Sequence, residues 1–328
     1  MARKEAPVFA LSTVFCLLAT ILSLCLGAAN LSFSEVAAAI FGGPKDTAGW
    51  IFHYARLPRT AACLLSGAAL AVAGAVIQGV LCNSLASPSI IGVNSGAALA
   101  VTVCCACGFL SGWAIALSAF LGAMVCVLLV MFTAEKIGAS RTTVILGGVA
   151  VSSFFSALSE AVTTLVPEAG VLSSDFRVGG FSSVSYPRLI PAGILILVAL
   201  TLVMTLHNEL EVLSLGEDTA QSLGLSVKKM RTILLILAAM LAGASVSFAG
   251  LLGFVGLIVP HAIRKILGGK CSLPLCALLG AGLVTACDLV ARMAFAPYEL
   301  PVGILLSVLG GPFFLALLIR KKGGKTSG

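Results

Sequence analysis

Residues 214–227 read S-L-G-E-D-T-A-Q-S-L-G-L-S-V, a polar stretch in a chain otherwise dominated by long apolar runs. Ser214 and Glu217 have the spacing of a capping box, which satisfies free amides at a helix start, and Gly224 is a typical helix end. These signals predict a short helix. Its apolar side would carry Leu215, Ala220 and Leu223. Its polar, solvent-facing side would carry Glu217, Asp218 and Gln221. The pattern fits an ordinary loop helix and also a helix on which a soluble partner docks.

The composition indicates a polytopic membrane protein. Of the 328 residues, 59% are hydrophobic and 10% are charged, and the mean hydropathy is +1.12. Soluble domains usually carry about 25% charged residues. The net charge of +7 does not indicate nucleic acid, because the basic residues are scattered between apolar runs. The 11 cysteines form neither a C-x-x-C zinc pattern nor a disulfide framework.

Ten apolar segments are candidates to cross about 30 Å of hydrocarbon. They are approximately 7–28, 60–81, 90–109, 113–133, 142–166, 189–207, 231–250, 252–267, 273–294 and 302–320. The first is too long for a signal peptide, so we expect a retained helix. Ten crossings with both termini in the cytoplasm leave most Lys and Arg residues inside, as the positive-inside rule requires. The polar stretch at 214–227 is then cytoplasmic.

Two predicted spans share a motif. Residues 65–74 read L-S-G-A-A-L-A-V-A-G, and residues 241–250 read L-A-G-A-S-V-S-F-A-G. They lie five spans apart, so they would cross in opposite directions, as the halves of an inverted repeat do in transporters. The alternative is that small residues recur only because they let helices pack closely. We expect one transmembrane domain, residues 1–328, with repeat halves 1–188 and 189–328.

Polar residues inside an apolar chain face protein or water. Gln78, Asn83 and Asn94 either line a path or tie helices together. The segment 252–267 is the weakest span, because it is short and rich in glycine. The candidates for a path or gate are Gln78, Asn83, Asn94, Ser95, Pro260 and His261.

Arginines mark the predicted outer side. Arg56 and Arg59 precede the second span, and Arg292 follows Asp288 by four residues in the ninth. This i, i+4 spacing allows Asp288 and Arg292 to neutralise each other. Outer arginines can snorkel to lipid headgroups, and they can also meet an acidic partner.

The sequence lacks several catalytic motifs. It has no G-x-x-x-x-G-K phosphate loop, no nucleophile elbow and no H-E-x-x-H metal motif. The three histidines fall in separate segments, so we expect no metal site. The chain is therefore expected not to be an enzyme.

Seven ordered segments resemble the permease family of ABC importers for iron-siderophore complexes, haem and cobalamin. They are R-L-P-R from Arg56, G-A-A-L-A-V-A-G-A-V-I-Q-G-V from Gly67, L-G-E-D-T-A-Q-S-L-G from Leu215, G-F-V-G-L-I-V-P-H from Gly253, D-L-V-A-R from Asp288, E-L-P-V-G from Glu299 and G-G-P-F-F from Gly310. The resemblance covers nearly the whole chain. It departs after Asn83, where Ser84 replaces the family's Pro, and at Phe176, where the family usually has Trp.

The resemblance implies an all-α type II importer fold with about ten transmembrane helices per subunit. It implies a homodimer, or a pair with a close paralogue, in the bacterial plasma membrane. Two cytoplasmic ATPase subunits would bind ATP and Mg, and a substrate-binding protein would dock outside. This chain would bind no cofactor and no nucleic acid, and its surroundings would be membrane lipid.

The resemblance also assigns roles to residues. The stretch 214–225 would be the coupling helix, with ATPase contacts at Leu215, Gly216, Glu217, Asp218, Ala220, Leu223 and Gly224. Arg56, Arg59 and Arg292 match positions that meet acidic residues of the binding protein. The implied function is ATP-driven import of an iron-siderophore complex, or of haem or cobalamin, by alternating access. The inverted repeat alone also permits a secondary transporter driven by an ion gradient, and a channel or structural membrane protein is a third possibility.

Overall fold

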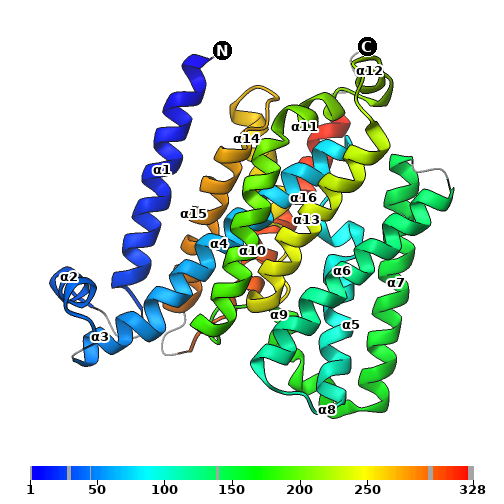
Figure 1. The fold of residues 1–328 in the computed structure, drawn as a ribbon. Coiled ribbons are helices and arrows are strands. Elements are labelled where there is room, and N and C mark those ends of the chain that lie inside the picture. The colour runs from blue at the N-terminus through cyan, green and yellow to red at the C-terminus, as the bar shows by residue number, and fades with distance from the viewer. Residues whose placement is uncertain (1, 28–30, 45, 138–139, 295–297, 324–328) are drawn as a thin grey trace.

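The computed structural model describes residues 2–27, 31–44, 46–137, 140–294 and 298–323 (Figure 1). Residue 1 and residues 324–328 lie outside this description, so the predicted location of the termini themselves is not described. The regular elements of the described residues are all helices, as expected.

The ten predicted spans coincide with ten helices. They are α1 (Ala2–Cys25), α4 (Leu57–Val80), α5 (Val93–Ala106), α6 (Gly112–Ile137), α7 (Arg141–Leu165), α10 (Tyr186–Thr205), α13 (Val227–Ala249), α14 (Val255–Ile266), α15 (Leu273–Met293) and α16 (Val302–Gly323). By length and composition, seven helices of the described chain can cross a membrane. Three others are shorter than these seven, namely α5, α14 and the apolar part of α16. With 12 residues, α14 is too short to span the hydrocarbon unaided.

Eight shorter elements connect these helices. They are α2 (Phe33–Gly42), α3 (Thr47–Ile51), η1 (Phe52–Arg56), η2 (Pro88–Ile91), α8 (Pro167–Leu172), α9 (Ser174–Val178), α11 (His207–Ser214) and α12 (Glu217–Ser222). Helix α2 begins with a complete capping box between Ser32 and Glu35. Its Phe33 and Phe41 side chains are exposed.

The centre of the bundle is built from α4 and α13, whose apolar windows are 78% and 72% buried, against 17% for α7. Ser66 of α4 and Ser245 of α13 share a buried hydrogen bond. At Gly74 of α4, an added Cβ would collide with the backbone of Gly256 in α14. These small residues therefore allow close helix contacts. The segment 65–74 lies in α4, and 241–250 forms the end of α13 with its C-cap Gly250. These two helices run in opposite directions (Figure 1), while the repeat itself stays a prediction.

The helices have two distinct ends (Figure 1). The start of α1, the end of α16, the connection between α14 and α15, and α12 lie together at what we call the α12 end. Helices α2, α3, α8 and α9 lie at the opposite end, which we call the α8 end. The bundle therefore separates the polar stretch 214–227 from the loops that carry α2 and α8.

The capping box predicted for Ser214 and Glu217 is wrong. The Ser214 hydroxyl donates to the Glu211 carbonyl at 2.7 Å, and α12 begins after Gly216 without a side-chain cap. The Glu217 carboxylate instead pairs with Arg231 and Arg141, because a cation stabilises a carboxylate more than a neutral amide does.

The predicted apolar face of the polar stretch forms only in part. Ala220 is fully buried, but Leu215 and Leu223 are 65% and 64% exposed. Gly224 ends the short helix with φ of 82°, a conformation that favours glycine.

Candidate functional site

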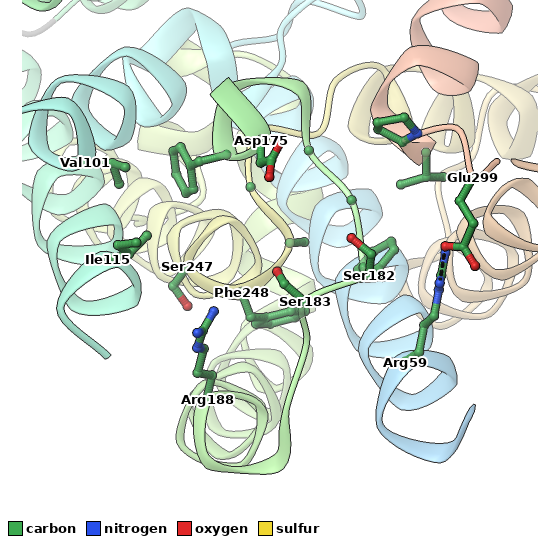
Figure 2. A pocket seen from close by; sticks show the side chains of 18 of the residues that line it. Arg59, Val101, Ile115, Asp175, Ser182, Ser183, Arg188, Ser247, Phe248 and Glu299 are labelled. Atoms are coloured by element: carbon green, nitrogen blue, oxygen red, sulfur yellow. Dashed lines mark hydrogen bonds and ion pairs between the residues drawn. The ribbon is translucent and has the colours of Figure 1, made fainter. Parts of the chain in front are cut away.

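A cavity of about 460 Å³ opens at the α8 end. Figure 2 shows Arg59 and Glu299 joined on one side of it, and Arg188 beside Ser183 and Ser247 on the other. Aromatic side chains complete the lining, namely Phe176, Phe181 and Phe248. The cavity thus combines guanidinium, carboxylate and hydroxyl groups with aromatic surface, a lining suited to a bulky polar molecule.

An ion-pair network shares Arg59 and Glu299 with the lining of this cavity. Asp288 is 1% exposed and accepts hydrogen bonds from Arg59 at 3.0–3.2 Å. Its other partner is Arg292, with a 3.0 Å ion pair that confirms the predicted i, i+4 neutralisation. Glu299 contacts Arg59 at 2.7 Å and is 37% exposed. The network joins α4, α15 and the residues before α16.

Two of the three predicted docking arginines do not lie on the exposed outer surface. Arg56 is 6% exposed and donates to the Leu26 carbonyl, while Arg292 is 4% exposed and donates to the Ser23 hydroxyl at 2.7 Å. Both guanidinium groups face inward because they satisfy buried acceptors within this chain. Arg59 lines the cavity, with a 13% exposed side chain. The docking role of all three stays a prediction.

Gln78 ties two helices together. It is 2% exposed, donates to the Gly256 carbonyl of α14 at 3.0 Å and accepts a hydrogen bond from Arg264. The sequence left two roles open for this amide, lining a path or joining helices. Its two hydrogen bonds fit the second role. Arg264 was missed as a site residue, because a single cation at a helix end also fits the positive-inside pattern.

The remaining gate candidates make mainly local contacts. Asn83 accepts from the Leu85 amide at 3.0 Å, Asn94 donates to Ser89 at 3.0 Å, and Ser95 donates to the Gly92 carbonyl at 3.2 Å. Pro260 is buried inside α14, and the neighbouring His261 packs edge-on against Phe313. Across the described residues, no hydrogen bond joins Asn94 or Ser95 to Gln78, and the path or gate role of these candidates stays a prediction.

At the α12 end, Glu217 anchors the polar stretch to two long helices. It forms ion pairs with Arg231 of α13 and, at 3.4 Å, with Arg141 of α7. The Arg231 side chain is 4% exposed, and the Glu217 side chain is 36% exposed. Asp218 and the two leucines beside α12 remain exposed. The sequence alone does not predict these two contacts, because both arginines are distant from Glu217 along the chain.

The part of the chain that the structure describes offers no cluster of three or more His, Cys, Asp or Glu side chains that could hold a metal ion. The chemistry of these sites is therefore that of ion pairs, hydrogen bonds and exposed apolar side chains.

Comparisons with known proteins agree on one family. The FecCD transport family model matches residues 15–320. The iron(3+)-hydroxamate import permease FhuB of Bacillus subtilis is 38% identical, and the match covers 98% of this chain and 86% of the length of FhuB. The ferric enterobactin transport permease FepG of Escherichia coli is 34% identical, over 93% of each chain. The hemin transport permease HmuU of Yersinia pestis is also 34% identical, over 90% of each chain.

A solved structure extends this agreement to the fold. A metal-chelate type ABC transporter in an inward-facing conformation matches with a TM-score of 0.85 and 28% identity, covering 96% of this chain and 100% of that one. The chain therefore belongs to the FecCD transport family and is a permease of the ABC importer type.

Proposed function

We propose that this permease carries a ferric siderophore complex into a bacterial cytoplasm, with haem and cobalamin as the other cargo classes. The observation that carries the proposal is the near full-length match to permeases named for iron(3+)-hydroxamate, ferric enterobactin and hemin. The cavity at the α8 end is compatible with such cargo, because it offers polar contacts and aromatic surface without a tight ion site.

The proposed assembly contains two copies of this chain, or one copy and a close paralogue, in the bacterial plasma membrane. A substrate-binding protein docks at the α8 end, where this chain presents Glu299 and the partly exposed Arg59, with Arg56 and Arg292 buried behind them. Two ATPase subunits, which bind ATP and Mg, dock at the cytoplasmic α12 end. Exposed charge pairs set orientation and association rate more than affinity.

The proposed mechanism is alternating access driven by the ATPase subunits. Closure of these subunits moves α12, and Glu217 transmits this movement to α13 and α7 through Arg231 and Arg141. The helices then rock around the centre formed by α4 and α13, which opens the path to one side at a time. Binding energy of the partners shifts this equilibrium.

Uptake into proteoliposomes tests the function. The vesicles contain this chain, the ATPase and the binding protein encoded beside it, and receive a labelled ferric hydroxamate, ferric catecholate, haem or cobalamin. We expect ATP-dependent uptake of a ferric siderophore, and none without ATP. Uptake that follows an ion gradient and ignores ATP would support a secondary transporter instead.

Leu223→Asp tests ATPase docking. Leu223 is exposed beside α12, and we expect it to insert into an apolar pocket of the ATPase. A charge there is expected to weaken ATPase binding by roughly 30-fold, the equivalent of a 2 kcal/mol contact. The measurement is the ATPase retained when the permease is purified from membranes at several ATPase concentrations.

Leu165→Asp is the matched control, because Leu165 is 82% exposed at the far end of α7. It is expected to retain the ATPase fully. Equal retention of the ATPase by the Leu223→Asp variant would remove Leu223 from the docking surface.

A further inference from the structure

Two cysteines meet where α14 is connected to α15. Cys271 lies just before the N-cap of α15, Ser272, and Cys276 lies in the first turn of that helix. Their sulfur atoms are 3.6 Å apart. Among the described cysteines, no other pair of thiols is in hydrogen-bonding contact. This proximity makes the pair a candidate for joint chemistry.

The contact has a structural explanation that does not account for all of its features. The residue before an N-cap often packs against the first turn of the helix, and two thiols can do so as small apolar groups. Cys276 is fully buried, as such packing requires, but Cys271 remains partly exposed. The Arg264 guanidinium also interacts with Cys271, which packing alone would not need.

The surroundings of Cys271 favour its thiolate form. The hydrogen bond from Cys276, followed by the positive charge of Arg264, lowers the pKa of the Cys271 thiol to about 7, although burial opposes the shift. The thiolate is the form of cysteine that attacks electrophiles. A partly exposed thiolate next to a second thiol is the arrangement of a cysteine that oxidises and is then resolved.

We propose that Cys271 and Cys276 form a redox-active dithiol that a peroxide converts into a disulfide across the start of α15. The Cys271 thiolate attacks one peroxide oxygen, the O–O bond breaks, and the other oxygen leaves as hydroxide or alkoxide. The Cys276 sulfur then attacks the resulting sulfenic acid, which releases water and forms the S–S bond. The two thiols lose two electrons together, and the peroxide gains them.

The loop before Cys271 permits the required movement. A disulfide has an S–S length of about 2.05 Å, so the sulfur atoms must approach by roughly 1.5 Å. Gly268 and Gly269 have φ of 67° and 106°, and an added Cβ at either would meet no atom within 4 Å. The two glycines are therefore not held by packing, and they give the backbone before Cys271 freedom to shift, although Cys271 itself packs against the core.

Oxidation would alter the contacts of Arg264. This arginine interacts with Cys271 and also donates to Gln78, which joins α4 to α14. The disulfide removes the thiolate charge beside Arg264 and fixes the α14–α15 connection to α15. We expect slower transport as a result, because α14 loses freedom to move relative to α15. This consequence rests on the proposed function, whereas disulfide formation does not.

Mass spectrometry of the intact transporter tests the thiol chemistry. The purified complex in lipid vesicles is treated with hydrogen peroxide, denatured, alkylated and digested with trypsin. The tryptic peptide 271–292 contains Cys271, Cys276 and Cys287. We expect three alkyl groups on this peptide before oxidation and one afterwards, with recovery to three after dithiothreitol. Three alkyl groups after peroxide treatment would overturn the proposal.

ATP-driven uptake tests the consequence. We expect peroxide to slow wild-type uptake at least 5-fold and dithiothreitol to restore it, while Cys276→Ser, a near-isosteric change, keeps its uptake. Cys82→Ser is the control, because Cys82 is exposed at the α12 end of α4, and it should stay as sensitive as wild type. Equal sensitivity of Cys276→Ser would overturn the regulatory role. Absence of uptake by untreated protein would contradict the proposed function and leave the peptide measurement valid.

Discussion

Asp288→Asn is expected to destabilise the folded permease by about 3–5 kcal/mol, the usual effect of removing one partner of a buried ion pair. Asp288 is the shared carboxylate of Arg59 and Arg292, and its side chain is 1% exposed. Asparagine keeps the shape but not the charge. Arg292, itself 3% exposed, would then be left buried without a carboxylate partner, while Arg59 would keep Glu299.

The midpoint of thermal unfolding in detergent measures this effect. The signal is the loss of the monodisperse peak in size-exclusion chromatography after heating. Glu299→Gln is the matched control, because it removes an ion pair to the same arginine from a side chain that is 37% exposed. An ion pair with one solvent-exposed partner is screened by water and contributes less, and fully exposed pairs contribute about 0–1 kcal/mol. We therefore expect a large fall in the unfolding midpoint for Asp288→Asn and a small one for Glu299→Gln.

A double variant separates charge from packing. Replacing both Asp288 and Arg292 with leucine removes the two most buried charges together while Arg59 keeps Glu299, and it is expected to recover part of the lost stability. Equal small shifts for Asp288→Asn and Glu299→Gln would mean that water reaches the network, and the buried-pair interpretation would be wrong.

The helices and the local pairs of this fold follow from the sequence, because their determinants lie within a few residues. Apolar runs predicted ten segments that coincide with ten helices, seven of them long enough to cross a membrane, and the spacing of Asp288 and Arg292 predicted their ion pair. The short span at 252–267 was identified as weak, and α14 has only 12 residues. Each of these predictions depends on helix periodicity or length alone.

The site contacts depend on which helices pack together, which local patterns do not specify. Arg59 and Asp288 are 229 positions apart, and Arg264 and Gln78 are 186 apart. The capping box at Ser214 was wrong for the same reason, since a partner 14 residues away, Arg231, binds Glu217 instead. The inward orientation of the outer arginines also required the positions of α1 and α15.

Glu217→Arg is expected to reduce ATP-driven uptake by more than 10-fold while the protein still inserts and folds. The substitution places a third guanidinium group beside Arg141 and Arg231, so attraction becomes repulsion. Helix α12 would then lose its link to α7 and α13 but keep its buried Ala220 and its exposed leucines. The ATPase would still find its docking surface.

Glu135→Arg is the matched control for charge reversal at this end of the bundle. Glu135 of α6 pairs with Lys228 of α13 at 3.2 Å, and both side chains are more than half exposed. Reversing this surface charge is expected to change uptake less than 2-fold, because exposed pairs contribute about 0–1 kcal/mol. Combining Glu217→Arg with Arg231→Glu restores opposite charges, and it should recover part of the uptake.

The ratio of ATP hydrolysed to substrate imported distinguishes a broken link from a lost partner. If Glu217 transmits movement, the Glu217→Arg complex keeps hydrolysing ATP while uptake falls, and the ratio rises. If Glu217 instead contributes mainly to ATPase binding, the permease-stimulated ATP hydrolysis falls together with substrate uptake. The ratio of the two then stays constant. Unchanged uptake would remove Glu217 from the transport cycle altogether. The rising ratio is the expected result, because Glu217 faces Arg231 and Arg141 within this chain.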